Sequence, residues 1–277
     1  MKLKSHFLIF SILFVINLFL VGSVVFSDLS SGNKSSGYSF KRIVPDKIKF
    51  KSAEKEEALV IKTNKASGTT KLEINMKSSK GDPVNFELKA KVDPNNPGKL
   101  KYRYKDEDDD KLTFVSIKYP EVKKAQANGS DTTKVATNEK VNNEDKDSFK
   151  IYYREKDGRD AFLCKVKITA EKLKIGSDEE LATPTYEIKN VLEKKKKKYV
   201  EKHKVYRSGN YVASVSKSKE SGKYKVKKVK EGEEEKEDLY STKDLNYMSY
   251  AIGILGLESM DPRLRAVIAA EILKKEK

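Results

Sequence analysis

Cysteine and histidine, which commonly serve as nucleophiles, general bases and metal ligands, are scarce in this 277-residue chain. Cys164 is the only cysteine, and His203 is the only histidine beyond the first ten residues. A zinc site needs clustered histidine, cysteine or carboxylate ligands, and an activated nucleophile needs a base within reach. His203 stands among lysines, where we expect its side chain to be solvated. The sequence therefore predicts no catalytic residue, no metal site and no cofactor.

The motifs that commonly mark an enzyme are incomplete or missing. We find no Gly-x-Ser-x-Gly elbow, no phosphate-binding glycine loop and no strand-linked Gly-x-Gly-x-x-Gly. The acidic run at residues 106–110 lacks the glycine and the closing glutamate of a calcium-binding loop. A carboxylate pair that hydrolyses glycosidic bonds can lie anywhere in a chain, so a carboxylate-dependent hydrolase stays an alternative. The absence of tryptophan, on which sugars commonly stack, argues against it, and we expect a protein that is not an enzyme.

Lysine is the residue type that the chain offers in quantity. It has 58 Lys and Arg against 42 Asp and Glu, a formal net charge of +16, and only seven of the 58 are arginine. Arginine is suited to bidentate recognition of phosphates and bases, so we expect no sequence-specific binding of nucleic acid. A surface of this charge attracts polyanions, and two lysine-rich segments form the candidate polyanion-binding site. Its members are Lys194, Lys195, Lys196, Lys197, Lys198, Lys202, Lys204, Lys225, Lys227 and Lys228; the alternative is a solvated surface, partly neutralised by the acidic run 231–238.

Alternation of apolar and polar residues predicts that most of the chain is β-sheet. The clearest segment spans residues 84–92, and similar ones lie at 72–76, 100–104, 111–119, 149–153 and 162–170. Successive side chains of a strand point to opposite faces, so each strand would have one apolar and one lysine-rich face, with Cys164 on the apolar one. Separated by turns rich in Gly, Pro, Asn and Asp, these strands predict an antiparallel sandwich or an open barrel.

Two regions have a different pattern. Ser177 followed by acids is typical of a helix start, and residues 186–202 are predicted to form a helix whose C-terminal end carries the lysine run. Near the C-terminus, apolar residues recur at helical spacing, and Asp261-Pro262 is a good start for a second helix. We expect a helical hairpin that covers the sheet or, alternatively, presents a face to a partner. The fold class is mainly β, and α+β overall.

The N-terminus has the pattern of an export signal. Lys2 and Lys4 precede an apolar run at residues 7–26. We expect cleavage after Ser27, because Val25-Phe26-Ser27 places small residues where signal peptidase inspects them. An uncleaved anchor is the alternative, since about 20 apolar residues can span a bilayer. A third is a lipoprotein signal: Leu20-Val21-Gly22 matches a bacterial lipobox, but Ser23 stands where the lipidated cysteine would be.

The predicted organisation has four parts. Residues 1–27 are a signal peptide or membrane anchor, and 28–45 a flexible Ser/Gly tether. Residues 46–235 form an antiparallel β-rich domain with a mobile loop at 121–147, and 239–277 form the helical hairpin. This arrangement, with its Lys-rich strands, resembles the surface lipoproteins of Borrelia-type spirochaetes in style across the whole chain. The resemblance implies a cell-envelope antigen that contacts host molecules, and it assigns no site residues.

These observations predict a non-enzymatic protein of the cell envelope, cell surface or extracellular space. We expect it to bind a macromolecular partner, either a protein or a polyanionic surface ligand, and to contact the membrane through its N-terminal segment if that segment is not cleaved. The alternatives are a structural envelope protein that docks another protein through its C-terminal helices, and the hydrolase.

Overall fold

A computed structural model describes residues 36–44, 46–64, 66–93, 96–105, 111–120, 147–155, 157–195, 198–218, 221–229, 240–241 and 246–276. The predicted export segment with Ser27 and the acidic runs at 106–110 and 231–238 fall outside these residues, as does the predicted loop except for Asp147. The described elements are β1 (Ser36–Val44), β2 (Lys47–Ser52), β3 (Ala58–Asn64), β4 (Thr69–Lys77), β5 (Pro83–Asp93), β6 (Asn96–Lys105), β7 (Lys111–Lys118), β8 (Ser148–Arg154), β9 (Asp160–Ile168), β10 (Lys172–Gly176), β11 (Tyr186–Lys195), β12 (Lys198–Arg207), β13 (Asn210–Lys217), β14 (Tyr224–Lys228), β15 (Tyr240–Ser241), α2 (Tyr247–Leu255) and α3 (Pro262–Leu273).

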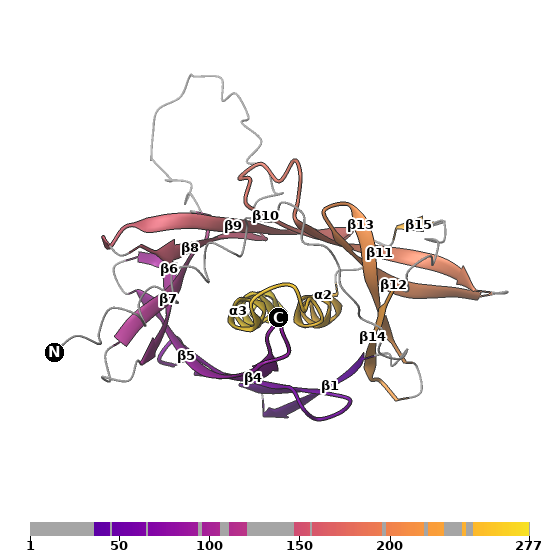
Figure 1. The fold of residues 1–277 in the computed structure, drawn as a ribbon, viewed down its shortest axis with the longest axis horizontal. Coiled ribbons are helices and arrows are strands. Elements are labelled where there is room, and N and C mark those ends of the chain that lie inside the picture. The colour runs from indigo at the N-terminus through magenta and orange to yellow at the C-terminus, as the bar shows by residue number, and fades with distance from the viewer. Residues whose placement is uncertain are drawn as a thin grey trace, which may run out of the picture.

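The strands form a closed antiparallel barrel (Figure 1). From β1 to β14, each strand pairs with the next one in the sequence, and β14 pairs with β1 to complete the ring. The short β15 adds to β11 beyond the residues that β10 pairs with. Closure satisfies the backbone groups that an edge strand would leave unpaired. The prediction of a mainly β chain with C-terminal helices is therefore confirmed, and the sandwich or open barrel is corrected to a closed barrel.

Strand β1 is the element that closes the ring, and it lies where the sequence predicted a flexible tether at residues 28–45. Ser39 and Lys41 alternate with Tyr38 and Phe40, whose rings pack in or against the core. Tyr38 pairs with Ser52 of β2 on one side and with Tyr224 of β14 on the other. The Ser- and Gly-rich neighbourhood hid this alternation, which is why the barrel appeared open from the sequence.

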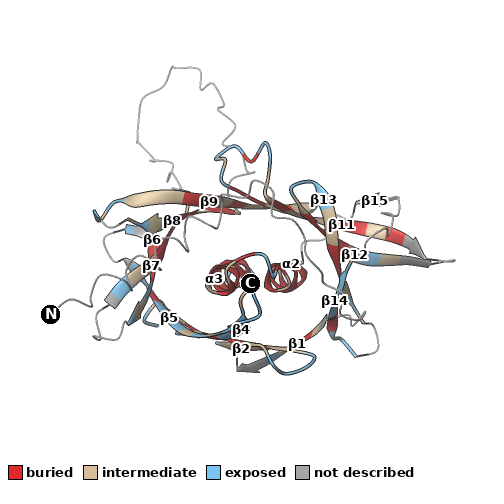
Figure 2. Ribbon diagram, in the orientation of Figure 1, coloured by how far each residue is buried: buried red, intermediate tan, exposed pale blue. Residues whose placement is uncertain are grey.

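The inner face of the barrel carries the apolar half of each strand. On β4, for example, Leu72, Ile74 and Met76 are buried, while Lys71 and Glu73 on the other face are partly exposed. Figure 2 shows the same alternation of buried and more exposed residues around the ring. The predicted period of two is thus the pattern of a wall with a dry inner and a wet outer face.

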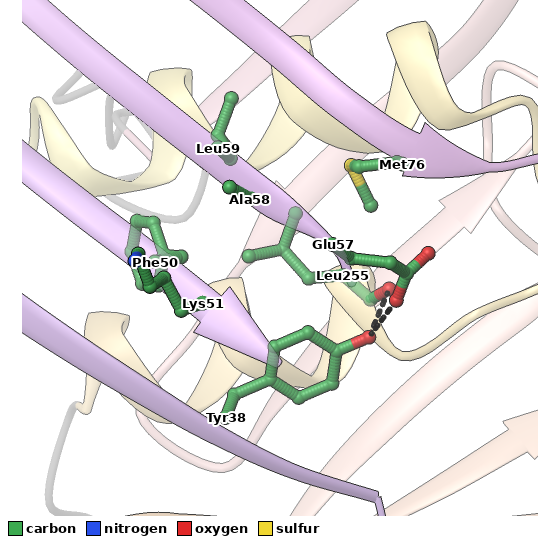
Figure 3. Close-up of a pocket in the computed structure, with 8 residues that line it drawn as sticks. All are labelled: Tyr38, Phe50, Lys51, Glu57, Ala58, Leu59, Met76 and Leu255. Carbon is green, nitrogen blue, oxygen red and sulfur yellow. Dashed lines mark hydrogen bonds between the residues drawn. The ribbon is translucent and has the colours of Figure 1, made fainter. Parts of the chain in front are cut away.

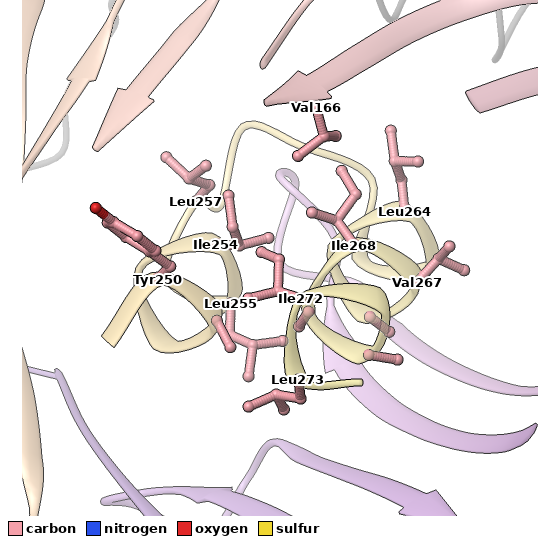
Figure 4. Packing of buried hydrophobic residues seen from close by; sticks show 14 of the residues in the cluster. Val166, Tyr250, Ile254, Leu255, Leu257, Leu264, Val267, Ile268, Ile272 and Leu273 are labelled. Atoms are coloured by element: carbon pink, nitrogen blue, oxygen red, sulfur yellow. The ribbon is translucent and has the colours of Figure 1, made fainter. Parts of the chain in front are cut away.

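The two helices lie inside the ring rather than on its outside (Figure 1). Asn246 caps α2 by accepting a hydrogen bond from the Ser249 amide at 2.9 Å, and Asp261 caps α3 with Pro262 in the first turn, as predicted. Residues 248–255 of α2 are all buried, because the wall surrounds both faces of the hairpin (Figure 4). We call α2, α3 and the turn between them the plug. In the described part of the chain, no helix is long and apolar enough to cross a membrane.

The predicted helix at residues 186–202 is wrong. These residues form the β11–β12 hairpin, in which ten residue pairs run from Tyr186–Arg207 to Lys195–Lys198. Tyr186 and Ile188 face the core and alternate with Glu187 and Lys189. This period of two fits a strand and not a helix. The predicted helix start at Ser177 is a turn instead, where the Asp178 carboxylate accepts hydrogen bonds from the Glu180 and Ala182 amides. Tertiary pairing outweighs the weak local helix preference here.

Candidate functional site

The plug fills the barrel interior closely. A methyl group added at Gly253 of α2 would lie 2.7 Å from Cδ1 of Ile188 on β11, and one at Gly256 would lie 3.0 Å from Cγ1 of Val226 on β14. A small hollow remains where Tyr38 and Phe50 meet Leu255 of the plug (Figure 3). Its volume is about 10 Å³, room for roughly one water molecule. The plug therefore packs closely against the wall at these points.

Glu271 of α3 is a charged group inside this core. Its side chain is fully buried and accepts hydrogen bonds from the hydroxyls of Tyr102 and Tyr119, and Nζ of Lys274 lies 2.6 Å from Oε1. Burial, and then the nearby Glu271 carboxylate, raise the pKa of Tyr102 well above its usual value, so this hydroxyl remains a donor. The cluster connects α3 to the wall at β6 and to Tyr119, just after β7.

Arg265 makes a second polar connection, on the same helix. Its guanidinium donates to the carbonyl of Leu255 at 2.9 Å and to the carbonyl of Lys77, at the end of β4, at 2.7 Å. Burial lowers the pKa of Arg265, while Tyr38 and Glu57 act in the opposite direction. Arg265 thus joins both helices of the plug to the wall. The sequence did not point to Arg265 or Glu271, although charged residues among the apolar positions of the α3 segment were the available signal.

His203 is not solvated, contrary to the expectation from its lysine neighbours. Its ring is buried on the inner face of β12, edge-on to Tyr250 of α2 at a centroid distance of 5.6 Å. Burial lowers the pKa of His203 to about 4, so the ring is neutral near pH 7. The hydroxyl of Tyr250 donates to the carbonyl of Thr169 at 3.2 Å. The histidine belongs to the contact between plug and wall, out of reach of a substrate.

Cys164 of β9 is buried and faces inward, as predicted. Burial raises the pKa of its thiol to about 12, which disfavours the reactive thiolate. Among the residues that the structure describes, no group of three or more His, Cys, Asp or Glu side chains is placed to hold a metal ion.

The first half of the predicted polyanion site lies on the β11–β12 hairpin, where Lys195 and Lys198 are the last paired residues. Lys202 forms an ion pair with the buried Glu193. Lys204 is only 1% exposed, with its ammonium 5.5 Å from the ring centroid of Tyr211, so it is not offered to an external ligand. The side chains at positions 194–198 lie outside the described part, so their role stays a prediction.

The second half lies on β14, and the structure brings it to the same wall. Ser214 of β13 stands opposite Lys204 on one side and Lys227 on the other. Lys225, Lys227 and Lys228 are exposed, and Lys228 pairs with Glu258 of the plug turn at 2.7 Å. The two sequence clusters therefore meet in space, but burial and ion pairing reduce the number of lysines that they present.

The outer face of the whole barrel, rather than one cluster, carries most of the described lysines. They alternate with core residues on β2, β4, β5, β6, β9 and β10, and the described chain has only two large apolar side chains that are well exposed, Val92 and Leu112.

In comparisons with known proteins, no family model, no curated protein and no solved structure matches this chain.

Proposed function

We propose that this chain is an exported, non-enzymatic protein that binds an anionic macromolecule on the outer face of its barrel. One observation carries the proposal: the inner strand positions are filled by the plug, while the outer positions are dominated by lysine. A partner of the described barrel would therefore contact it from outside, where it meets a cationic surface. Such a surface raises the association rate and the affinity of polyanions.

The buried ionisable groups support a structural rather than a catalytic use. Glu271, Arg265 and His203 each lie between plug and wall, and the first two have protein partners at hydrogen-bonding distance. A catalytic group must be within reach of the reacting atoms of a substrate. The proposal therefore assigns these residues to holding the plug in place.

Export is proposed from the N-terminal sequence. Its basic start and apolar run are typical of a signal that is cleaved, here after Ser27, or retained as an anchor. Either outcome would place the barrel in the cell envelope, at the cell surface or outside the cell, where anionic polymers and host proteins are available as partners. Docking through the C-terminal helices, the structural alternative, would require the plug to leave the barrel.

The test uses the exported chain purified without its export signal. It is passed over immobilised heparin, single-stranded DNA, anionic lipid vesicles and an uncharged polysaccharide at increasing salt. We expect retention on at least one polyanion that is lost at moderate salt, because salt screens interactions between exposed charges. If the protein flows past every anionic matrix at low salt, the proposed function is excluded.

A further inference from the structure

Outward-facing side chains on five consecutive strands form one line of positive charge. In the register of the sheet, each member lies directly opposite the next, across the pairs β2–β3, β3–β4, β4–β5 and β5–β6. We call this line the cation row; its members are Lys47, Lys62, Lys71, Lys89 and Arg103. Adjacent strands lie about 4.8 Å apart, so four steps give a row about 19 Å long. Lys91 of β5 and Lys101 of β6, also directly opposite each other, extend it on one side.

Acidic residues neutralise the middle of the row but not its ends. Glu73 and Glu87 lie beside it, with Glu73 at 2.5 Å from Lys62, and Glu87 at 2.6 Å from Lys71 and 3.0 Å from Lys89. The hydrogen bond from Lys62 lowers the pKa of Glu73, which is therefore ionised near neutral pH. Among the described cations of the row and its extension, four have no acidic partner at ion-pair distance: Lys47, Lys91, Lys101 and Arg103.

A row of this kind is unfavourable in the free protein. Directly opposite side chains on paired strands have Cβ atoms about 5 Å apart, and like charges there destabilise the sheet. A ligand with closely spaced negative charges would convert this repulsion into attraction. The partner that fits is therefore a linear polyanion lying across the strands.

The shape and composition of the wall narrow the class of polyanion. The strands that carry the row follow one long side of the ring and turn towards its end at β6, so the surface is convex (Figure 2). A flat membrane would contact only part of such a curved row, whereas a flexible chain can follow it. Single-stranded nucleic acid is bound largely by stacking on aromatic rings. The described outward residues directly beside the row are Lys, Glu, Thr, Ser, Asn and Val60, and none of these carries an aromatic ring.

From this register we infer that the cation row, with Lys91 and Lys101, is the binding track for a flexible sulfated polysaccharide. Lysine ammonium groups are compact point charges that suit sulfate groups without demanding bidentate geometry. The inference rests on the proposed function and specifies both its ligand and the part of the wall that binds it. It also differs from the lysine-run site predicted from the sequence, which lies on β11, β12 and β14.

The test replaces together the three cations without an acidic partner at the β5–β6 end of the row and its extension, as Lys91→Thr, Lys101→Thr and Arg103→Thr. Threonine keeps the strand preference. A matched control removes three charges from β9 and β10 on the far wall, as Lys165→Thr, Lys167→Thr and Lys174→Thr. Lys167 and Lys174 lie directly opposite each other there, as neighbouring members of the row do. A third variant carries Lys225→Thr, Lys227→Thr and Lys228→Thr. Binding of heparin fragments is measured by calorimetry, and unfolding in urea shows that each variant is folded.

We expect the row variant to lose heparin affinity by roughly tenfold or more, without loss of stability, while the far-wall variant changes little. Fragments shorter than the row should bind more weakly than longer ones. An equal loss in the row and far-wall variants, or a larger loss in the β14 variant, would overturn the track but leave the proposed function intact. Equal or tighter binding of single-stranded DNA or anionic vesicles to the row would overturn the sulfated-polysaccharide assignment. A wild-type protein that binds no polyanion would instead remove the proposed function itself.

Discussion

His203 shows how one buried side chain couples folding to pH. Its pKa is about 4 in the folded chain and about 6.5 when exposed, because burial disfavours the charged ring. At pH 7 both states are neutral and there is no penalty. As the pH falls below about 6.5, the unfolded chain gains a proton that the folded chain takes up only near pH 4. Stability is therefore lost across this window.

We predict that the free energy of unfolding of the wild type falls by about 3 kcal/mol more than that of His203→Phe between pH 7.5 and 4. Phenylalanine keeps a ring beside Tyr250 but cannot be protonated. Urea unfolding at several pH values measures both proteins. The carboxylates titrate equally in the two chains, so the difference isolates the histidine, and identical pH profiles would contradict its buried neutral state.

Glu271 connects the plug to the wall through its hydrogen-bonding partners. Glu271→Leu should destabilise the fold by about 3 kcal/mol, because it leaves the buried hydroxyl of Tyr102 without its acceptor. Glu271→Gln keeps an acceptor oxygen and should cost about half as much. Thermal unfolding of both variants checks the order, and a Leu variant as stable as the Gln variant would argue against the cluster.

At the scale of elements, helix α2 of the plug packs closely on β11 of the wall at Gly253. Gly253→Ala should destabilise by about 1–3 kcal/mol, although alanine is the better helix former, because the new methyl group would overlap Cδ1 of Ile188. Ile188→Val removes that carbon. The double variant should therefore recover part of the loss, giving a coupling free energy of about 1 kcal/mol in a double-mutant cycle. Additive effects would mean that α2 does not pack on β11 at this point.

Some strands and helices could be predicted from the sequence, and others could not. Strands such as β4, β5 and β6 were predictable, because each has a long alternation with one apolar face. The start of α3, with Asp261 as its N-cap and Pro262 in its first turn, was also predictable from local sequence. Strand β1 was not, because Ser and Gly residues surround its short alternation and its partner β14 lies far along the chain. The β11–β12 hairpin was not, because its lysine run also fits the C-terminal end of a helix. The cation row depends on register between five strands, so no single segment reveals it.

At the scale of the whole molecule, closure of the barrel decides which side chains lie inside and which lie outside. The pairing of β14 with β1 completes the ring around the plug, with the apolar strand faces inside and the lysine-rich faces outside. Most of the described lysines then lie on the outside. The interior specifies a stable plugged barrel, and the register of its wall decides where opposed cations accumulate.

Lysine acetylation, mapped by mass spectrometry with and without bound heparin fragments, tests this account most directly. The account predicts that the fragments protect Lys91, Lys101 and Lys47 strongly, and Lys165 and Lys167 on the far wall little. Uniform protection of all exposed lysines, or protection centred on Lys225 and Lys228, would contradict it.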